Sequence, residues 1–219
     1  EGYRYTKSEG AQTISWDNPP FTILAPRTRE IWIAADGSGR IREQPGEPIF
    51  LSEADRQAWR EAGEPQLSEP VDQDFEPGGY PITDPPSADP IFLRGVVLAR
   101  AIQADAPLNA EMFVIVGDML RETAADPELR AGLYRVAATI DGIELLGETR
   151  DRAGRPGVAV GMTADYSGLK ERNELIFDPG SSALLGEVRV VVEQWGNIPA
   201  GTVVGYNTYL ESKVVPELP

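Results

Sequence analysis

The stretch REIWIAADGSGRIRE, residues 29–43, contains two runs of alternating apolar and polar residues around a glycine-rich turn. Ile31 and Ile33 alternate with polar or small residues before the turn, and Ile41 resumes the alternation after it. A period of two residues is typical of a β-strand with one buried and one solvated face. The glycines at 36–39 can adopt the positive φ of a tight turn. The stretch therefore predicts a β-hairpin.

The same turn chemistry recurs at two later places, as Asp-Arg-Ala-Gly at 151–154 and Asp-Pro-Gly-Ser at 178–181. In each turn an Asp side chain can accept hydrogen bonds from the turn amides, and a Gly can take the left-handed conformation. Because one solution is used three times, we interpret Asp-Gly-Ser-Gly at 36–39 as a structural turn rather than as a catalytic loop.

The C-terminal part of the chain predicts an antiparallel meander over residues 143–214. Apolar runs predict five strands joined by short turns, and such strands pair antiparallel because parallel pairing needs a long crossover. The strands are expected at 143–149, 157–164, 171–177, 184–192 and 202–210.

Four helices are predicted, one at 52–62 and three in a helical insertion at 89–140. Each begins at a residue that can accept hydrogen bonds from the free amides of the first turn, and two of these residues precede a Pro. The expected N-caps are Ser52, Asp89, Asn109 and Asp126. The three later helices carry apolar residues at helical spacing, so we expect one face of each to contact a core.

These features together predict a single α+β domain over residues 1–219. The N-terminal strands and the meander would form a curved antiparallel sheet of seven to ten strands, a half-barrel with helices packed on one face. The helical stripes need an apolar partner, and the alternating strands offer one.

Residues 61–90 contain eight acidic residues, seven prolines and no Lys or Arg. Proline removes backbone donors and like charges repel. We therefore expect an acidic, proline-rich loop at 63–87 with high mobility and without regular structure. If this loop is docked instead, Phe75 and Tyr80 are the residues expected to anchor it.

The composition excludes several classes of function. The net charge of −15 argues against nucleic acid and anionic membrane surfaces as partners. The chain contains no His and no Cys, which excludes Ser-His and Cys-His nucleophile arrangements. It also lacks a run of about eighteen apolar residues, so we expect no direct membrane insertion by these residues.

The motifs that suggest chemistry are weak. Ser167 and Lys170 match S-x-x-K, but they fall in an expected hairpin instead of at a helix start. Acids alternate at 72, 74 and 76 as in a calcium loop, but Pro77 stands where that loop needs Gly. We therefore predict no catalytic residue, no cofactor, no metal ligand and no enzymatic activity. A carboxylate-based hydrolase is the alternative, since the fold sets the separation of any acidic pair.

Seven stretches resemble, in this order, an uncharacterised actinobacterial family of single-pass membrane proteins. They are REIWIAADGSGRIRE, FLSEADRQAW, AEMFVIVGDMLRET, LRAGLYRVAA, DRAGRPGVAV, NELIFDPGSSALLGE and GTVVGYNTYL. The resemblance covers nearly the whole chain. It implies an extracytoplasmic domain whose transmembrane anchor lies outside these 219 residues, and it implies no catalytic residues.

The order of strands, helices and meander also resembles the lipoprotein-carrier half-barrel shared by LolA and the envelope-stress sensor RseB. The stretch LIFDPGSSALLGE, with Asp178 at its turn, is similar to a strand-turn-strand stretch in those proteins. This resemblance implies a curved sheet lined by helices, which leave an apolar cavity for acyl chains.

Two functions follow from these expectations. A non-catalytic binding or sensing module would hold an apolar or acyl ligand between sheet and helices, whereas an interaction domain with a filled core would present its sheet edge or acidic loop to an envelope protein partner. The methionines are compatible with both functions, because methionine side chains line adaptable pockets and also fill irregular cores. The sequence does not choose between them or predict the oligomeric state. The residues expected to line an apolar ligand are Phe92, Val96, Met112, Phe113, Val116 and Met119.

Overall fold

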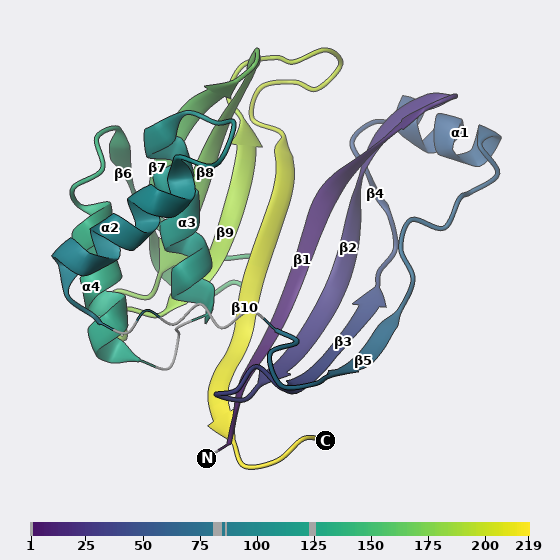
Figure 1. Ribbon diagram of the computed structural model, residues 1–219. Coiled ribbons are helices and arrows are strands. Elements are labelled where there is room, and N and C mark those ends of the chain that lie inside the picture. The colour runs from purple at the N-terminus through teal and green to yellow at the C-terminus, as the bar shows by residue number, and fades with distance from the viewer. Residues whose placement is uncertain (1, 81–84, 86, 123–125) are drawn as a thin grey trace.

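The computed structural model describes residues 2–80, 85, 87–122 and 126–219, and within them ten strands form one curved sheet accompanied by four helices (Figure 1). The N-terminal elements are β1 (Tyr3–Asp17), β2 (Pro20–Ile33), β3 (Gly39–Pro45), β4 (Ile49–Phe50), α1 (Glu53–Glu61) and β5 (Val71–Phe75). The helical insertion contains α2 (Pro90–Ala101), α3 (Leu108–Glu122) and α4 (Pro127–Ala137). The meander contains β6 (Ile143–Arg150), β7 (Pro156–Tyr166), β8 (Leu169–Phe177), β9 (Leu184–Val191) and β10 (Val203–Val215).

The strand order is β5-β3-β2-β1-β10-β9-β8-β7-β6, with β4 paired to β2, and the pairings are antiparallel. The first strand and the last strand lie side by side in the middle, where Tyr3 pairs with Val215. This pairing joins the N-terminal hairpin and the C-terminal meander into one continuous sheet. The predicted α+β class, a curved antiparallel sheet with helices on one face, is confirmed.

The helices α2, α3 and α4 cover the concave face of one half of the sheet, over β7 to β9 (Figure 1). Their apolar stripes form the main core with side chains from the strands, including Met162 of β7 and Leu175 of β8. On α2 the buried stripe is narrower than expected, because Phe92 lies on its exposed side. The buried helical residues include Leu93, Val97, Met112, Phe113, Val116, Met119, Leu120, Leu129, Leu133 and Val136.

Three of the four expected N-caps are confirmed. Ser52 accepts a hydrogen bond from the amide of Asp55, and Asp89 and Asp126 each accept two from the first turns of α2 and α4. The expected cap Asn109 is wrong: α3 begins at Leu108, two residues earlier than that cap implies, because the carbonyl of Pro107 already accepts the first helical hydrogen bond. None of the described helices combines the length and apolar composition that a membrane crossing needs.

The turn at 36–39 is held by Asp36, as expected. Its Oδ1 accepts hydrogen bonds from the backbone amide and the hydroxyl of Ser38, at 2.9 and 2.7 Å, which lower the pKa of Asp36. The carbonyls of Asp36 and Gly37 also accept hydrogen bonds from the amides of Gly78 and Tyr80. Gly37 has a φ of 78°, and a Cβ there would lie 2.7 Å from the Tyr80 carbonyl oxygen. The turn is therefore a docking point for a distant segment.

The prediction that residues 63–87 lack regular structure is wrong for Val71–Phe75, which form the edge strand β5. The reason is charge: Asp72 and Asp74 lie beside Arg40 on β3, at 2.7 and 3.2 Å, so the repulsion between the acids is offset. The rings of Phe75 and Tyr80 lie 5.7 Å apart, as expected of a docked loop. Residues 81–84 and 86 of this stretch lie outside the described residues, and its mobility stays a prediction.

Candidate functional site

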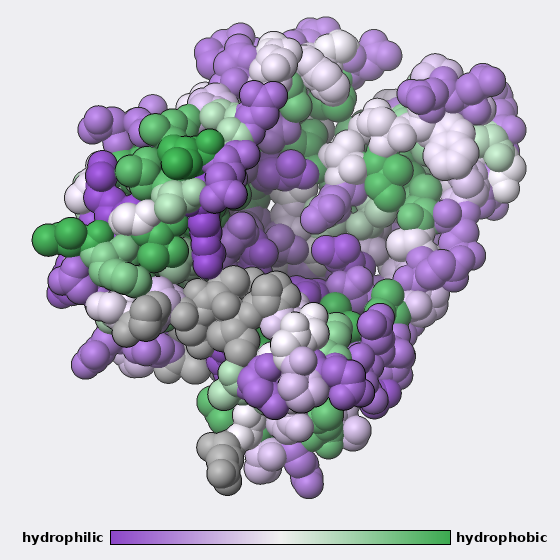
Figure 2. Space-filling model, in the orientation of Figure 1, coloured by the Kyte–Doolittle hydropathy of each residue, from purple (hydrophilic) through white to green (hydrophobic). Residues whose placement is uncertain are grey.

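A cleft of about 340 Å³ lies on the concave face at the border of the helical layer. One wall is α3, which contributes Val114, Asp118 and Arg121, and the other is β2, which contributes Arg27 and Arg29. The floor consists of β1, β10, β9 and β8. Figure 2 shows a hollow between the helical side and the N-terminal strands, with mostly hydrophilic side chains inside it.

Strand register arranges the floor in two rows that cross the sheet. Residues paired directly across neighbouring strands point to the same face, and Glu187 and Tyr209 contact α3, so these rows face the helices. The first row is Arg27, Gly10, Asn207, Glu187 and Leu175. The second row is Gln12, Gly205, Arg189 and Asn173.

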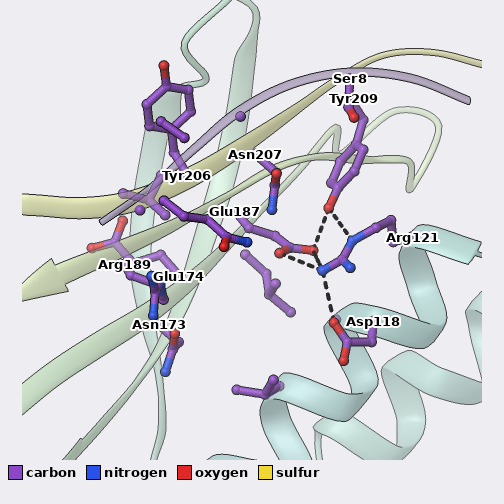
Figure 3. A pocket seen from close by; sticks show the side chains of 18 of the residues that line it. Ser8, Asp118, Arg121, Asn173, Glu174, Glu187, Arg189, Tyr206, Asn207 and Tyr209 are labelled. Atoms are coloured by element: carbon purple, nitrogen blue, oxygen red, sulfur yellow. Dashed lines mark hydrogen bonds and ion pairs between the residues drawn. The ribbon is translucent and has the colours of Figure 1, made fainter. Parts of the chain in front are cut away.

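Arg121 at the end of α3 joins the helix to the sheet through a network of hydrogen bonds (Figure 3). Its Nη2 donates to Oε2 of Glu187 and to Oδ1 of Asp118, each at 2.9 Å. Its Nε donates to the hydroxyl of Tyr209 at 2.5 Å, and that hydroxyl donates to Oε1 of Glu187 at 2.8 Å. The three partners come from β9, α3 and β10, so one guanidinium connects three elements.

Burial and mutual charge set the protonation of this network. Burial lowers the pKa of Arg121, but Glu187, Tyr209 and Asp118 together outweigh it, and that pKa is raised. Burial, with the charge of Glu187, raises the pKa of the Tyr209 hydroxyl well above its usual value. Burial also raises the pKa of Asp118, although Arg121 opposes the shift. At neutral pH the network is therefore a charged guanidinium with a neutral tyrosine.

A second group of charges, the arginine group, consists of Arg27, Arg29 and Arg189. Arg27 and Arg29 share Glu43, with Nε to Oε1 distances of 3.9 and 3.1 Å. Arg189 has Glu171 as its partner, also at 3.9 Å. A separation of 3.9 Å is too long for a hydrogen bond. Three guanidiniums thus share two carboxylates, and two of the three ion pairs are loose.

The chemistry that the cleft offers is binding through charges and hydrogen bonds. Two of its three lining carboxylates, Asp118 and Glu187, are both engaged by Arg121, which argues against their use as a hydrolytic pair. The S-x-x-K match lies elsewhere, in the β7–β8 hairpin, where Lys170 Nζ donates to Glu193 at 2.5 Å. Two of the three acids of the calcium-like stretch, Asp72 and Asp74, pair with arginines of β3.

The residues expected to line an apolar ligand fall into two groups, those buried in the core and those at its edge or outside it. Met112, Phe113, Val116 and Met119 meet in the core beneath α3, and Phe113 also lines the cleft. Val96 packs against this core in part, and Phe92 lies on the outer side of α2 with 42 % of its surface exposed. That these residues contact a ligand stays a prediction.

Sequence reasoning missed the charged residues of the cleft. A signal was present: Arg27 and Arg29 alternate within β2, and Glu187 and Arg189 alternate within β9, so each pair shares one face of its strand. Charges on a sheet face indicate that no apolar layer covers it there. That the two pairs belong to one cleft depends on the pairing of β1 with β10, which the sequence did not indicate.

No family model matches the chain, and no curated protein matches it. Among solved structures it is similar to MucB, with a TM-score of 0.37 and 12% identity over 100% of this chain and 55% of that chain. It is also similar to the MucA/MucB complex structure of Pseudomonas aeruginosa (TM-score 0.34, 15% identity, 98% and 53% covered). A third likeness is an outer membrane lipoprotein-sorting protein domain from Vibrio parahaemolyticus (TM-score 0.19, 7% identity, 100% and 87% covered). The chain spans about half the length of the MucB chains it matches.

Proposed function

We propose that this domain is a non-catalytic binding module that holds a polar ligand in the cleft between α3 and β2. The observation that carries the proposal is a cavity of about 340 Å³ lined largely by charged and amide side chains, beside a core that the protein's own residues fill. Ligand pockets commonly begin at about 300 Å³ and fix their ligand by a few convergent polar groups. The Arg121 network stiffens the wall against which such a ligand would rest.

An apolar or acyl ligand between the sheet and the helices is the first alternative. It would need room where Met112, Val116 and Met119 now pack, and these side chains are at most 3 % exposed. The helices would have to separate from the sheet to admit an acyl chain, which would expose the main core. The polar cleft needs no such rearrangement, and we favour it for that reason.

An interaction domain that contacts an envelope protein is the second alternative. It is favoured by the outer surface of α2, where Ile91 and Ile102 are 85 % and 67 % exposed. Exposed apolar side chains that cluster on one element often mark contact surfaces. The edge strand β5, whose outer backbone groups are available for pairing, is a second surface of this kind.

We further propose an extracytoplasmic location, with an anchor outside these 219 residues. The support is the resemblance of the seven sequence stretches to the actinobacterial family. Fractionation of host cells, with protease added to intact spheroplasts, tests this: the domain is expected to be degraded while cytoplasmic markers survive. Protection of the domain would contradict the proposed location.

The binding function is tested by native mass spectrometry of the domain purified from its host. We expect a bound small molecule at about one per chain that a Val114→Trp variant loses, because Val114 lines the cleft and Trp would fill it. Val214→Trp is the matched control, since Val214 is 62 % exposed near the end of β10. An extracted acyl lipid would favour the first alternative, and a ligand-free protein would contradict the module.

A further inference from the structure

We propose that the arginine group Arg27, Arg29 and Arg189 forms an oxyanion site, which binds a carboxylate or phosphate group of the ligand. This inference rests on the proposed function and names the chemistry of the ligand. Guanidinium groups bind carboxylate and phosphate oxygens through paired N–H donors, and such charge-assisted bonds are stronger than neutral ones.

The first support is charge. The lining of the cleft contains four arginines and three carboxylates, in a chain whose net charge is −15. One of these arginines, Arg121, is satisfied by Glu187 and Asp118, and the lining residue Glu174 is occupied by Arg172 at 2.7 Å. The excess positive charge therefore lies with the arginine group.

The second support is the incomplete pairing of the arginine group. Arg29 Nε is buried and lies 3.1 Å from Glu43, but the described residues offer it no hydrogen bond of good geometry. Arg27 and Arg189 are held only loosely, at 3.9 Å from Glu43 and Glu171, and their side chains are 42 % and 45 % exposed. Donors of both residues are thus free to turn toward a ligand.

The third support is the shape of the floor. A Cβ at Gly205 would lie 2.7 Å from Nε and 2.8 Å from Nη2 of Arg189, so the Nε–Nη2 edge of this guanidinium lies against Gly205 of β10. The guanidinium of Arg189 therefore extends from β9 over β10, the strand beside β1. Strand β2 lies two strands beyond β10, roughly 10 Å away, and its Arg27 and Arg29 line the same cleft. An oxyanion over Gly10 would lie between Arg189 of the floor and the arginines of the β2 wall.

The counter-charges that face this position are Glu43 on β3, Glu171 on β8 and Glu187 on β9. Glu187 is held by Arg121 and Tyr209, and Glu43 already serves two arginines. An incoming oxyanion would therefore add a partner for Arg27 and Arg189 without displacing a well-formed bond.

The test is an amide-shift titration of the folded domain by NMR with inorganic phosphate, citrate, hexaglutamate and the neutral sugar maltose. We expect saturable shifts around Gly10 and Gly205 with at least one anion, weakened by added salt. Arg189→Gln and Arg27→Gln should each lower the affinity about tenfold, whereas Arg60→Gln, a charge-matched change on exposed α1, should not. Gly205→Ala should also weaken binding, because it displaces the Arg189 head without changing charge.

The outcomes separate the sources of the oxyanion. Tighter binding of citrate or phosphate assigns a small-molecule ligand, and tighter binding of hexaglutamate assigns the acidic side chains of a polypeptide; both support the site. Equal affinities for Arg189→Gln and Arg60→Gln, or no saturable shift with any anion, would overturn it. If maltose shifts the cleft amides while no anion does, the binding module stands and the oxyanion assignment fails.

Discussion

Strands β7–β9 and strands β1–β3 belong to one sheet and face the same side, yet their concave faces differ in chemistry. Under the helices the strands present apolar side chains such as Met162 and Leu175, which pack into the main core. Beyond the edge of the helices they present charges, with Arg27 and Arg29 on β2 and Glu43 on β3. The helical layer therefore ends where burial would have to desolvate several charges.

The Arg121 network lies at the border between the two halves. Arg121 lies at the end of α3 and hydrogen-bonds to Glu187 and Tyr209 on the sheet. These contacts hold α3 on the sheet, and they also form the α3 wall of the cleft. Burial of apolar area stabilises one half, and unburied charge keeps the other half available for a ligand. A stable fold and an open site are thus divided between two parts of one sheet.

The largest difference between the halves is expected for core truncation. Phe113→Ala should lower the free energy of unfolding by about 3–5 kcal/mol, because its side chain is fully buried under α3. Phe92→Ala is the matched control on α2 and should change it by less than about 1 kcal/mol, because its ring is 42 % exposed. Urea unfolding measures both. Similar losses for the two variants would contradict a core confined beneath the helices.

A smaller effect is expected at the border. Arg121→Met should lower the free energy of unfolding by about 2–4 kcal/mol, because it leaves the partly buried Glu187 and Asp118 without their cation. The side chain of Arg121 is 28 % exposed, so we expect a smaller loss than for a fully buried ion pair. Arg56→Met removes the exposed pair with Glu53 and should change stability by less than about 0.5 kcal/mol. An Arg121→Met variant as stable as Arg56→Met would show that the border needs no ion pair.

The carboxyl groups of Asp118 and Asp36 should make stability depend on pH with opposite signs. The pKa of Asp118 is raised by burial, so its contribution is present at low pH and is lost as pH rises through that raised pKa. The stability of the native protein relative to Asp118→Asn should therefore fall with rising pH above about 4. The pKa of Asp36 is lowered by Ser38, so its contribution is lost as pH falls through that lowered pKa. The stability relative to Asp36→Asn should rise with pH below about 4.

Urea unfolding between pH 3 and 7 gives both differences. If stability changes with pH in the same way for the native protein and for Asp118→Asn, burial does not raise the pKa of Asp118.

The smallest effect concerns the outer edge of the open half. Arg40→Gln should loosen β5 by removing the partner of Asp74 and one of the two arginine partners of Asp72, and a Glu-specific protease should then cut after Glu69 or Glu76 severalfold faster. Arg60→Gln is the control, because it removes an equal charge from α1. Unchanged cleavage in Arg40→Gln would mean that backbone pairing alone holds the strand.

The covered half was predictable from the sequence because its signals are local. The stripe of Met112, Val116 and Met119 follows helical spacing, and Asp89 and Asp126 each mark a helix start within a few residues. The hairpin turn at Asp36 likewise depends on residues two positions apart. Interactions of this range follow from periodicity and capping alone.

Apart from its β2–β3 hairpin, the open half was not predictable, because it depends on pairing between distant residues. Gly10 meets Asn207, and Gly205 meets Arg189, only through the register of β1, β10 and β9. Strand β5 was missed for the same reason: the composition of its own segment argues against a strand, and the arginine that offsets its acids lies on β3. Composition describes a segment alone, whereas a sheet edge depends on its neighbour.

The polar cleft and the filled core are tested most directly by comparing where a polar and an apolar probe bind. In NMR titrations with citrate and, separately, with decanol, we expect saturable citrate shifts at Ser8, Gly10, Gly205 and Asn207, which line the cleft. We expect no saturable decanol shifts at Met112, Val116 and Met119, which pack in the core. Saturable decanol shifts at these core residues, with the cleft residues unchanged by citrate, would contradict both expectations.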